Sequence, residues 1–528
     1  MNHSISYSTK CQEFPHNFHL KCQENLCSQK VHNIRNGRQS EHMNYTSISF
    51  YLFLAAAAAV YYAVPVFWRW MVLLAGSIAF YFLAYKTGWW IVLASVLMTY
   101  AAGLCLEHLG QRDFRSGHRI KKAVFIAALV LTVLPWFCVK NGDFLTGLLH
   151  RPSFHWIVPL GISFYTLQMA AYLADIYTGK IHAQKNPAKY ALFVLFFPQI
   201  VQGPIPRYKE LAGQLYQGHL FDEREFAKGF QLIVWGFFLK FMIADKAAVA
   251  VNEIFSRPDI YRGCYVFAAG VLYSLELYAD FLACTQICRG SAGLFGIHLK
   301  GNFMRPYLVV SVKDFWRRWH MSLSSWLRDY IYIPLGGSRR GTLSKYLNLA
   351  VTFAVSGIWH GAGYKFLFWG LLHAAYQTAG NMTAGMQDWL YERVFKLHKA
   401  SSVRRALQRA GVFFWVMTAW VIFRADSLTT GLDMVMSMFT VHNPWIFFND
   451  SLLALGLSWK EWCVLAVSLL LLAFVERKQE RGESIRDSIL RMPFYMRWSV
   501  YTAAILGTMI FGTYGFGFDA QDFIYRGF

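Results

Sequence analysis

The chain has 528 residues, of which 55% are hydrophobic, 18% aromatic and only 15% charged, and its mean hydropathy is +0.30. These proportions exclude a disordered chain and an ordinary soluble domain, and they indicate an integral membrane protein. The formal net charge of +21 comes from Lys and Arg between apolar runs. There such residues set orientation and meet anionic lipid headgroups, so we discount nucleic-acid binding.

Residues 1–42 differ from the rest of the chain, because they are polar, rich in His, Asn and Gln, and lack the apolar core of a signal peptide. Met43 then opens a hydrophobic segment almost at once. We expect residues 1–42 to be a non-native extension from an over-extended gene start. A disordered tail or a small Cys/His metal site is the alternative, although the spacing matches no zinc signature. Residues 43–528 are expected to form one membrane domain.

Apolar runs long enough to cross a bilayer, about 20 residues each, recur along the rest of the chain. The candidates are residues 45–65, 69–85, 88–106, 122–140, 155–176, 189–203, 228–253, 264–283, 345–360, 364–383, 411–424, 461–475 and 498–515. They predict an all-α, polytopic membrane protein with about 11 to 13 membrane helices, including re-entrant or interfacial ones. No internal repeat is visible, which disfavours a transporter built from two related halves.

Four loops between these runs are strongly basic: residues 107–122, 314–341, 393–409 and 477–486. Because Lys and Arg accumulate on the cytoplasmic side of a membrane, we expect all four loops to be cytoplasmic.

The second of these loops reads DFWRRWHMSLSSWLRDYIYIPLGGSRRG over residues 314–341. Trp316, Trp319, Trp326 and Tyr330 recur at helical spacing, with arginines largely on other sides. This pattern predicts an amphipathic helix in the cytoplasmic interface, with an aromatic face and snorkelling arginines. An interfacial helix does not explain His320, which lies between Trp319 and Met321.

Two further histidines fall in VSGIWHGAGYKFLFWGLLHA, residues 355–374. An ionisable side chain at membrane depth is costly and often functional. Alternatively, His360 and His373 each satisfy a backbone carbonyl and pack a helix end. The glycines after His360 permit a tight break and a close approach of a ligand. No serine nucleophile elbow, P-loop, dinucleotide fingerprint or zinc signature is present. What remains is a histidine that takes the proton of an alcohol attacking an acyl group.

The two histidine-bearing runs resemble the signature of the membrane-bound O-acyltransferase (MBOAT) family, in its bacterial branch with the alginate O-acetyltransferases and the teichoic-acid D-alanyl transferases. Supporting blocks are VPLGISFYTLQMAAYLADIYTGK (158–180), FFPQIVQGPIPRYKEL (196–211), NFMRPY (302–307) and WVIFRADSL (420–428). The likeness covers residues 43–528 nearly end to end.

This resemblance implies that His360 is the essential histidine, a general base inside a central tunnel, and that His320 is the second functional histidine of the branch. His373 also occupies a recurring position. An acyl group would come from a cytoplasmic donor such as acetyl-CoA or an acyl carrier protein thioester, with no bound cofactor or metal. The acceptor would be a hydroxyl of a cell-envelope polysaccharide, at the plasma membrane of a bacterial cell.

Supporting or substrate-binding roles are expected for Trp359, Trp319, Arg317 and Asp329. Arginine recognises phosphate well, so Arg317 and its neighbours could contact a phosphorylated donor. Membrane orientation and lipid headgroups explain the same arginines. Asp329 could equally pair with a neighbouring cation on the interfacial helix.

Two alternatives stay open at this point. D-alanyl transfer to lipoteichoic or teichoic acid would use a thioester on a carrier protein, whereas polysaccharide acetylation could involve a second, exported acetyltransferase. PLGGSRRG (334–341) resembles the polysaccharide subgroup, but LACTQICRG after Phe281 replaces the Ser-Gly-Tyr run common in the family, which could mark a distinct subgroup. The alternative of another class is a proton-coupled transporter with His360 as a relay.

Overall fold

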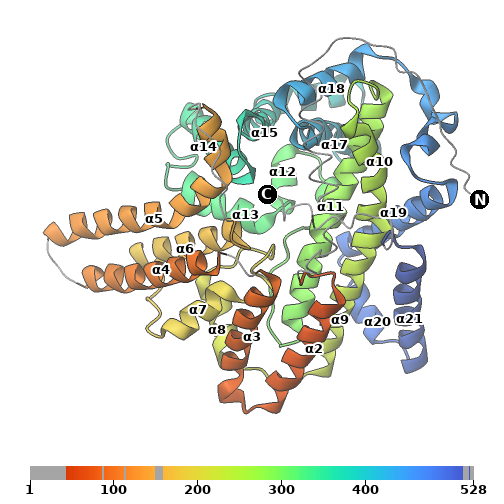
Figure 1. The fold of residues 1–528 in the computed structure, drawn as a ribbon. Coiled ribbons are helices and arrows are strands. Elements are labelled where there is room, and N and C mark those ends of the chain that lie inside the picture. Colours follow the sequence, from red (N-terminus) through yellow and green to blue (C-terminus); the bar gives the residue numbers. More distant parts are fainter. Residues whose placement is uncertain (1–42, 86–87, 112–114, 149–157, 515–522, 524–528) are drawn as a thin grey trace, which may run out of the picture. The chain divides into compact units, whose positions relative to one another are not determined.

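The computed structural model describes residues 43–85, 88–111, 115–148, 158–514 and 523 (Figure 1). The prediction for residues 1–42 lies outside this part of the chain. The unit Asn44–Phe528 is built from helices, and no strand occurs among its described residues. The predicted all-α class is therefore confirmed.

Among the described residues, the first half of this unit contains eleven helical elements. They are α2 (Ile48–Ala63), η1 (Val66–Trp68), α3 (Arg69–Ala84), α4 (Trp89–Gly110), α5 (Arg115–Leu148), α6 (Ile162–Tyr177), α7 (Pro187–Leu195), α8 (Tyr208–Gln217), α9 (Glu223–Phe238), η2 (Leu239–Ala244) and α10 (Asp245–Ser256). The second half begins with a helix of 30 residues, α11. Its elements are α11 (Cys264–Gly293), η3 (Pro306–Leu308), α12 (Val312–Arg318), α13 (Met321–Leu327), η4 (Arg328–Tyr332), α14 (Thr342–His360), α15 (Tyr364–Met382), α16 (Ala384–Trp389), η5 (Leu390–Val394), α17 (Ser402–Arg424), α18 (Leu428–Thr440), η6 (Pro444–Phe447), η7 (Asp450–Leu455), α19 (Trp459–Glu480), α20 (Ile485–Leu490) and α21 (Phe494–Phe511).

Five described helices are long and apolar enough to cross a membrane by length and composition. They are Val66–Ala84, Trp89–Gly110, His118–Gly142, Cys264–Gly293 and Ser402–Arg424. Each predicted apolar run overlaps a helix, but several of these helices are shorter than a full span, and residues 196–203 of the run 189–203 lie beyond the end of α7. Helix α7 has nine residues, and predicted segment 228–253 is divided by the π-helical turn η2. Apolar runs predict burial, whether lipid or protein covers the helix.

Helix α11 is the most enclosed of the five candidate spans, with 78% of its apolar window buried inside the protein. It lies beside α9 and α10, and α17 crosses it (Figure 1). By contrast, α4 and α5 extend away from it, and their apolar windows are only 28% and 17% buried. Because protein covers most of α11, this helix forms part of the core of the membrane domain.

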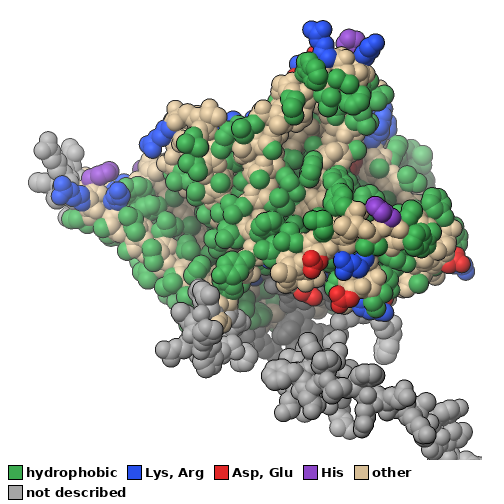
Figure 2. Space-filling model, turned by 90° about the horizontal axis from the view of Figure 1, so that it is seen from above, with side chains coloured by type: hydrophobic (Ala, Val, Ile, Leu, Met, Phe, Trp, Pro, Cys, Tyr) green, Lys and Arg blue, Asp and Glu red, His purple; other side chains and the backbone are tan. Residues whose placement is uncertain are grey.

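The outer surface carries many large apolar side chains. Figure 2 shows hydrophobic side chains over much of the face seen from above, with basic side chains gathered at a few projecting places. Examples are Leu97, Leu131, Val467 and Ile510, each more than half exposed. Such a surface would be unfavourable in water and is suited to a lipid environment.

A buried ion-pair cluster lies where η2 meets α11. The Nζ of Lys240 lies 2.8 Å from a carboxylate oxygen of Asp245 and 2.8 Å from one of Asp280. All three side chains are at most 6% exposed. Because an isolated charge in such a place is very unfavourable, the ammonium group of Lys240 stabilises the two carboxyl groups that it contacts.

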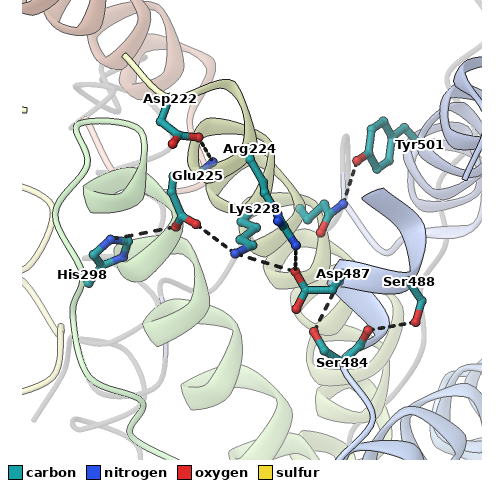
Figure 3. Close-up of polar contacts among 10 residues, drawn as sticks. Asp222, Arg224, Glu225, Lys228, His298, Ser484, Asp487, Ser488 and Tyr501 are labelled. Carbon is teal, nitrogen blue, oxygen red and sulfur yellow. Dashed lines mark hydrogen bonds and ion pairs between the residues drawn. The ribbon is translucent and has the colours of Figure 1, made fainter. Parts of the chain in front are cut away.

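A polar network joins α9 to α20 at one end of the bundle. Asp487 pairs with Arg224 at 3.2 Å and with Lys228 at 3.7 Å, and Lys228 also pairs with Glu225 at 2.8 Å (Figure 3). Its cationic members lie near the basic loop 477–486. This network attaches the C-terminal helices to the central ones.

The predicted interfacial helix of residues 314–330 is wrong in two respects. The structure has two short helices, α12 and α13, which are separated by Trp319 and His320. His320 adopts the left-handed conformation, with φ 42° and ψ 55°. The aromatic face is also buried in protein, since Trp316, Trp319 and Trp326 are at most 9% exposed. Backbone pairing with residues 302–304, described below, explains the break.

Candidate functional site

His360 is the last residue of α14 and is 2% exposed. Its ring lies against three aromatic rings from three helices, with centroid distances of 4.9 Å to Trp359, 5.0 Å to Trp369 and 5.6 Å to Phe423. The chain then turns into α15 through Gly363, whose φ of 95° is open mainly to glycine. His360 is therefore held in an aromatic environment at a sharp turn between two helices.

His373 lies one helix later, on α15, and is fully buried. Its Nδ1 accepts a hydrogen bond of 3.3 Å from Nε1 of Trp316. A neutral imidazole carries its proton on one nitrogen, so this bond places the proton on Nε2. Among the described residues, that Nε2 has no hydrogen-bond partner. The indole of Trp369 contacts both His373, at 4.9 Å, and His360, and so connects the two imidazoles.

His320 joins the same cluster from the break between α12 and α13. It is 1% exposed, and its ring lies 4.8 Å from Phe281 and 5.9 Å from Trp359, which also contacts His360. His320 and His360 are close enough to interact electrostatically, and so are His373 and His360. The three histidines predicted from the sequence thus form one buried group.

Trp359 and Trp319 support this group by packing. Trp359 is 5% exposed, and its Nε1 donates a hydrogen bond of 3.2 Å to the carbonyl oxygen of Ser163 on α6. Trp319 is 1% exposed and stacks on Phe315 at 5.3 Å and packs on Trp420 at 5.1 Å. Both indoles are fixed by neighbours on other helices, which limits the movement of the histidines between them.

Arg317 and Asp329 lie at the periphery. Arg317 is largely exposed and pairs with Asp314 at 3.1 Å. Asp329 pairs with Arg207 at 3.1 Å and with Arg328 at 2.8 Å. These ion pairs hold Asp329 at η4, and the structure does not bring it among the histidines.

A cavity of about 540 Å³ opens between the α12–η4 segment and helices α14 and α15. Four cations contribute to its lining, namely Lys313, Arg317, Arg328 and Lys345. Its inner wall includes Trp316, the partner of His373, and Ser356, which is fully buried and whose Oγ has no partner within the part of the chain described. Ser356 is one turn, about 6 Å along α14, before His360. The cavity therefore leads from a basic surface toward the histidines.

The sequence reasoning missed Ser356, Lys345 and Asn302, whose side chain contacts His320. The spacing of Ser356, four residues before His360, would have placed both on one face of the predicted helix. No local signal connects Asn302 with His320, because they are 18 residues apart and meet only in the fold.

Known proteins of similar sequence indicate the family of this chain. The family model described as "MBOAT, membrane-bound O-acyltransferase family" matches residues 179–392, a range that contains all three histidines. A probable alginate O-acetylase of Azotobacter vinelandii is 32% identical over 446 residues, which cover 81% of this chain and 83% of the relative.

Two relatives with other printed activities are also similar. A peptidoglycan O-acetyltransferase of Helicobacter pylori is 34% identical, with 55% of this chain and 58% of the relative covered. A teichoic acid D-alanyltransferase of Bacillus subtilis is 32% identical, with 49% and 68% covered. These acyl-transfer relatives and the matched family model give no support to the transporter alternative. The chain therefore belongs to the membrane-bound O-acyltransferase family and is an acyltransferase of the membrane.

Proposed function

We propose that this protein transfers an acetyl or similar small acyl group from a cytoplasmic donor to a hydroxyl of a cell-envelope polysaccharide, at the plasma membrane of a bacterial cell. His360 is the general base in this proposal. The observation that carries it is the burial of His360 among Trp359, Trp369 and Phe423 at the turn into α15, inside the range that matches the acyltransferase family.

The cavity supports a donor site on the basic side of the protein. Lys313, Arg317, Arg328 and Lys345 contribute to its lining, and such cations suit the phosphate groups of acetyl-CoA or of a phosphopantetheine arm. The wall formed by α14 and α15 combines apolar side chains such as Phe353 with polar ones such as Ser356 and Gln377. A thioester arm that entered with its phosphates at the cations would carry its acyl end toward the histidines.

The proposed chemistry balances without any further reagent. A ring nitrogen of His360 takes the proton of the acceptor hydroxyl as its oxygen attacks the thioester carbonyl carbon. The new C–O bond forms, the C–S bond breaks, and the sulfur leaves as a thiolate that receives the proton. Proton transfer of this kind is typically worth about 10²- to 10⁴-fold in rate. The buried aromatic surroundings limit water, which would otherwise hydrolyse the thioester.

His320 and His373 have supporting roles in this proposal. Both imidazoles share an aromatic neighbour with His360, Trp359 for His320 and Trp369 for His373. His320 orients or binds the reacting groups, and His373 stabilises the inner wall. Trp359 and Trp319 keep these rings in position.

D-alanyl transfer to a teichoic acid is the second candidate. It is favoured by the similarity to the Bacillus subtilis D-alanyltransferase, of which 68% is covered. The donor would then be a carrier-protein thioester, and the same basic cavity would receive its phosphopantetheine arm. For polysaccharide acetylation, a second, exported acetyltransferase is the expected partner.

The test is the ester-linked acyl content of the cell envelope, released by mild base and identified by mass. It compares cells with the wild type, with His360→Ala and without the gene. Loss of acetate in the last two supports the proposal, whereas loss of D-alanine favours the second candidate. His182→Ala is the matched control, since that side chain is 95% exposed and outside the site. If His360→Ala reaches the membrane in normal amount and keeps normal acylation, His360 is not the base.

A further inference from the structure

We infer that Asn302 is a positioning residue, which fixes the ring of His320 in the tautomer that carries its proton on Nδ1. The inference rests on the proposed function, because it gives His320 a defined part in the transfer reaction. Asn302 lies in the NFMRPY block, and its side chain is 1% exposed.

The side-chain oxygen of Asn302 is a shared acceptor. Oδ1 accepts hydrogen bonds from the backbone N–H of Ser322 at 3.0 Å and from the Ser322 hydroxyl at 2.8 Å. The Nδ1 atom of His320 lies 3.3 Å from the same oxygen. One buried atom thus connects the histidine with the first turn of α13.

The backbone contact decides which amide atom faces His320. A backbone N–H can only donate, so the atom of Asn302 that it meets must be the oxygen and not the NH₂ group. An oxygen attracts the imidazole nitrogen only if that nitrogen carries a hydrogen. Nδ1 is therefore the donor, and in the neutral ring Nε2 is the basic nitrogen.

The backbone on both sides holds this arrangement in place. Met321 N donates to the carbonyl oxygen of Asn302 at 2.8 Å, and Met304 N donates to that of Arg318 at 2.9 Å. These two bonds flank His320, whose φ of 42° is unusual for a residue other than glycine. Such strain persists where the surroundings determine the conformation, and it is common at functional sites.

Aromatic side chains also contact the ring of His320. The ring of Phe281 from α11 and that of Trp359 from α14 pack on it. Among the residues described, the titratable side chain that interacts with it electrostatically is His360. Asn302 is consequently the polar side chain positioned to select the tautomer.

Two nearly isosteric replacements separate this role from packing. Asn302→Asp keeps an acceptor oxygen at this position and replaces Nδ2, which has no partner in the described chain, with the second oxygen of an ionisable carboxyl group. Asn302→Leu keeps the approximate volume and removes the acceptor. Asn443→Leu is the matched control, because Asn443 Oδ1 also accepts from a backbone N–H, that of Cys264, away from the site.

The experiment measures acyl transfer to the envelope and its pH profile in membranes, with thermal stability as the folding check. Asn302→Leu should lower transfer about 10²-fold, because His320 would no longer be held in the orientation and tautomer that position the reacting groups. Asn302→Asp should keep at least about a tenth of the activity and move the acid limb of the profile to higher pH, because a carboxylate stabilises the imidazolium. Asn302→Leu combined with His320→Ala should be no worse than His320→Ala alone.

Several results would overturn the inference. The first two are an activity of Asn302→Leu within twofold of wild type and equal losses of activity in the Asp and Leu variants. The others are a double variant whose loss of activity is the product of the two single losses, and full activity of His320→Ala. If Asn302→Leu does not fold, an unshifted profile of Asn302→Asp overturns it. Failure of the proposed function is distinguishable, since the wild type would then form no His360-dependent ester at all.

Discussion

Trp316 donates its indole N–H to Nδ1 of His373 across 3.3 Å, and the same tryptophan contributes to the inner wall of the basic cavity. The contact connects α12 to α15, and both helices border the cavity. A group bound in the cavity would therefore touch a residue that already orients one of the three histidines.

Trp316→Phe removes the indole N–H and keeps an aromatic ring. We expect acyl transfer to fall about 10-fold, because one buried hydrogen bond of about 1.4 kcal/mol is lost and His373 is free to change tautomer. The measurement is the rate of ester formation in membranes with a saturating donor. If the Phe variant matches the wild type while Trp316→Ala is impaired, the indole serves packing alone.

Reversing charges at the cavity, with Lys313→Glu and Arg317→Glu together, should weaken donor binding. Charge-assisted contacts to phosphate contribute about 1.5–3 kcal/mol each, so the KM for a thioester donor should rise at least about 10-fold, with a smaller change in kcat. Arg393→Glu, on η5 and outside the cavity lining, is the control. An equal rise in the control would point to general surface charge instead.

Lys240→Met should strongly destabilise the protein, because Asp245 and Asp280 would keep buried carboxylates without their shared cation. Removing one partner of a buried ion pair typically costs about 3–5 kcal/mol. Thermal unfolding in detergent measures the effect. The triple variant with Asp245→Asn and Asp280→Asn should recover most of the loss, and failure to recover would show that Lys240 is needed for another reason.

The end of α19 should respond to acid. Burial acts against ionisation of Glu480, but hydrogen bonds from Arg305 and Arg318 outweigh it and lower the pKa of Glu480 below its ordinary value of 4.5. A lowered folded-state pKa means that the stabilisation is complete above pH 4.5 and is lost as the pH falls through the folded value. Since these ion pairs are partly exposed to solvent, they contribute at most about 1 kcal/mol to the free energy of unfolding.

The check is the difference in Tm between wild type and Glu480→Gln across pH 3–7. The difference should be largest at pH 5–7 and should shrink toward pH 3. A constant difference over this range would contradict an ionic contribution from Glu480.

Most of the helices could be predicted from composition and periodicity, because long apolar helices are required both in a bilayer and in a large apolar core. The predicted segment 264–283 corresponds to α11 and segment 411–424 to α17. Periodicity cannot distinguish lipid from protein as the cover. This is why, of the thirteen similar runs, five correspond to helices of full spanning length and composition in the described part of the chain.

The residues of the candidate site that could be predicted are those whose side chains are unusual in an apolar segment. His320, His360 and His373 were identifiable because imidazoles among Trp and Gly at membrane depth are uncommon. The break at His320 was not predictable, since Trp316, Trp319 and Trp326 fit a continuous helix. The helix is broken there by backbone hydrogen bonds with Asn302 and Met304. These residues are distant in the sequence, so the local pattern does not indicate the break.

The close crossing of α14 and α15 has a consequence for the histidines. A Cβ atom added at Gly357 would come within 2.2 Å of the carbonyl oxygen of Phe366, and one added at Gly370 within 2.2 Å of that of Phe353. Gly357 precedes His360 by three residues, and Gly370 precedes His373 by three. The distance between the His360 and His373 rings therefore depends on the absence of side chains at these two glycines. An alanine at either position would push α14 and α15 apart and change that distance, although no reactive group would be replaced.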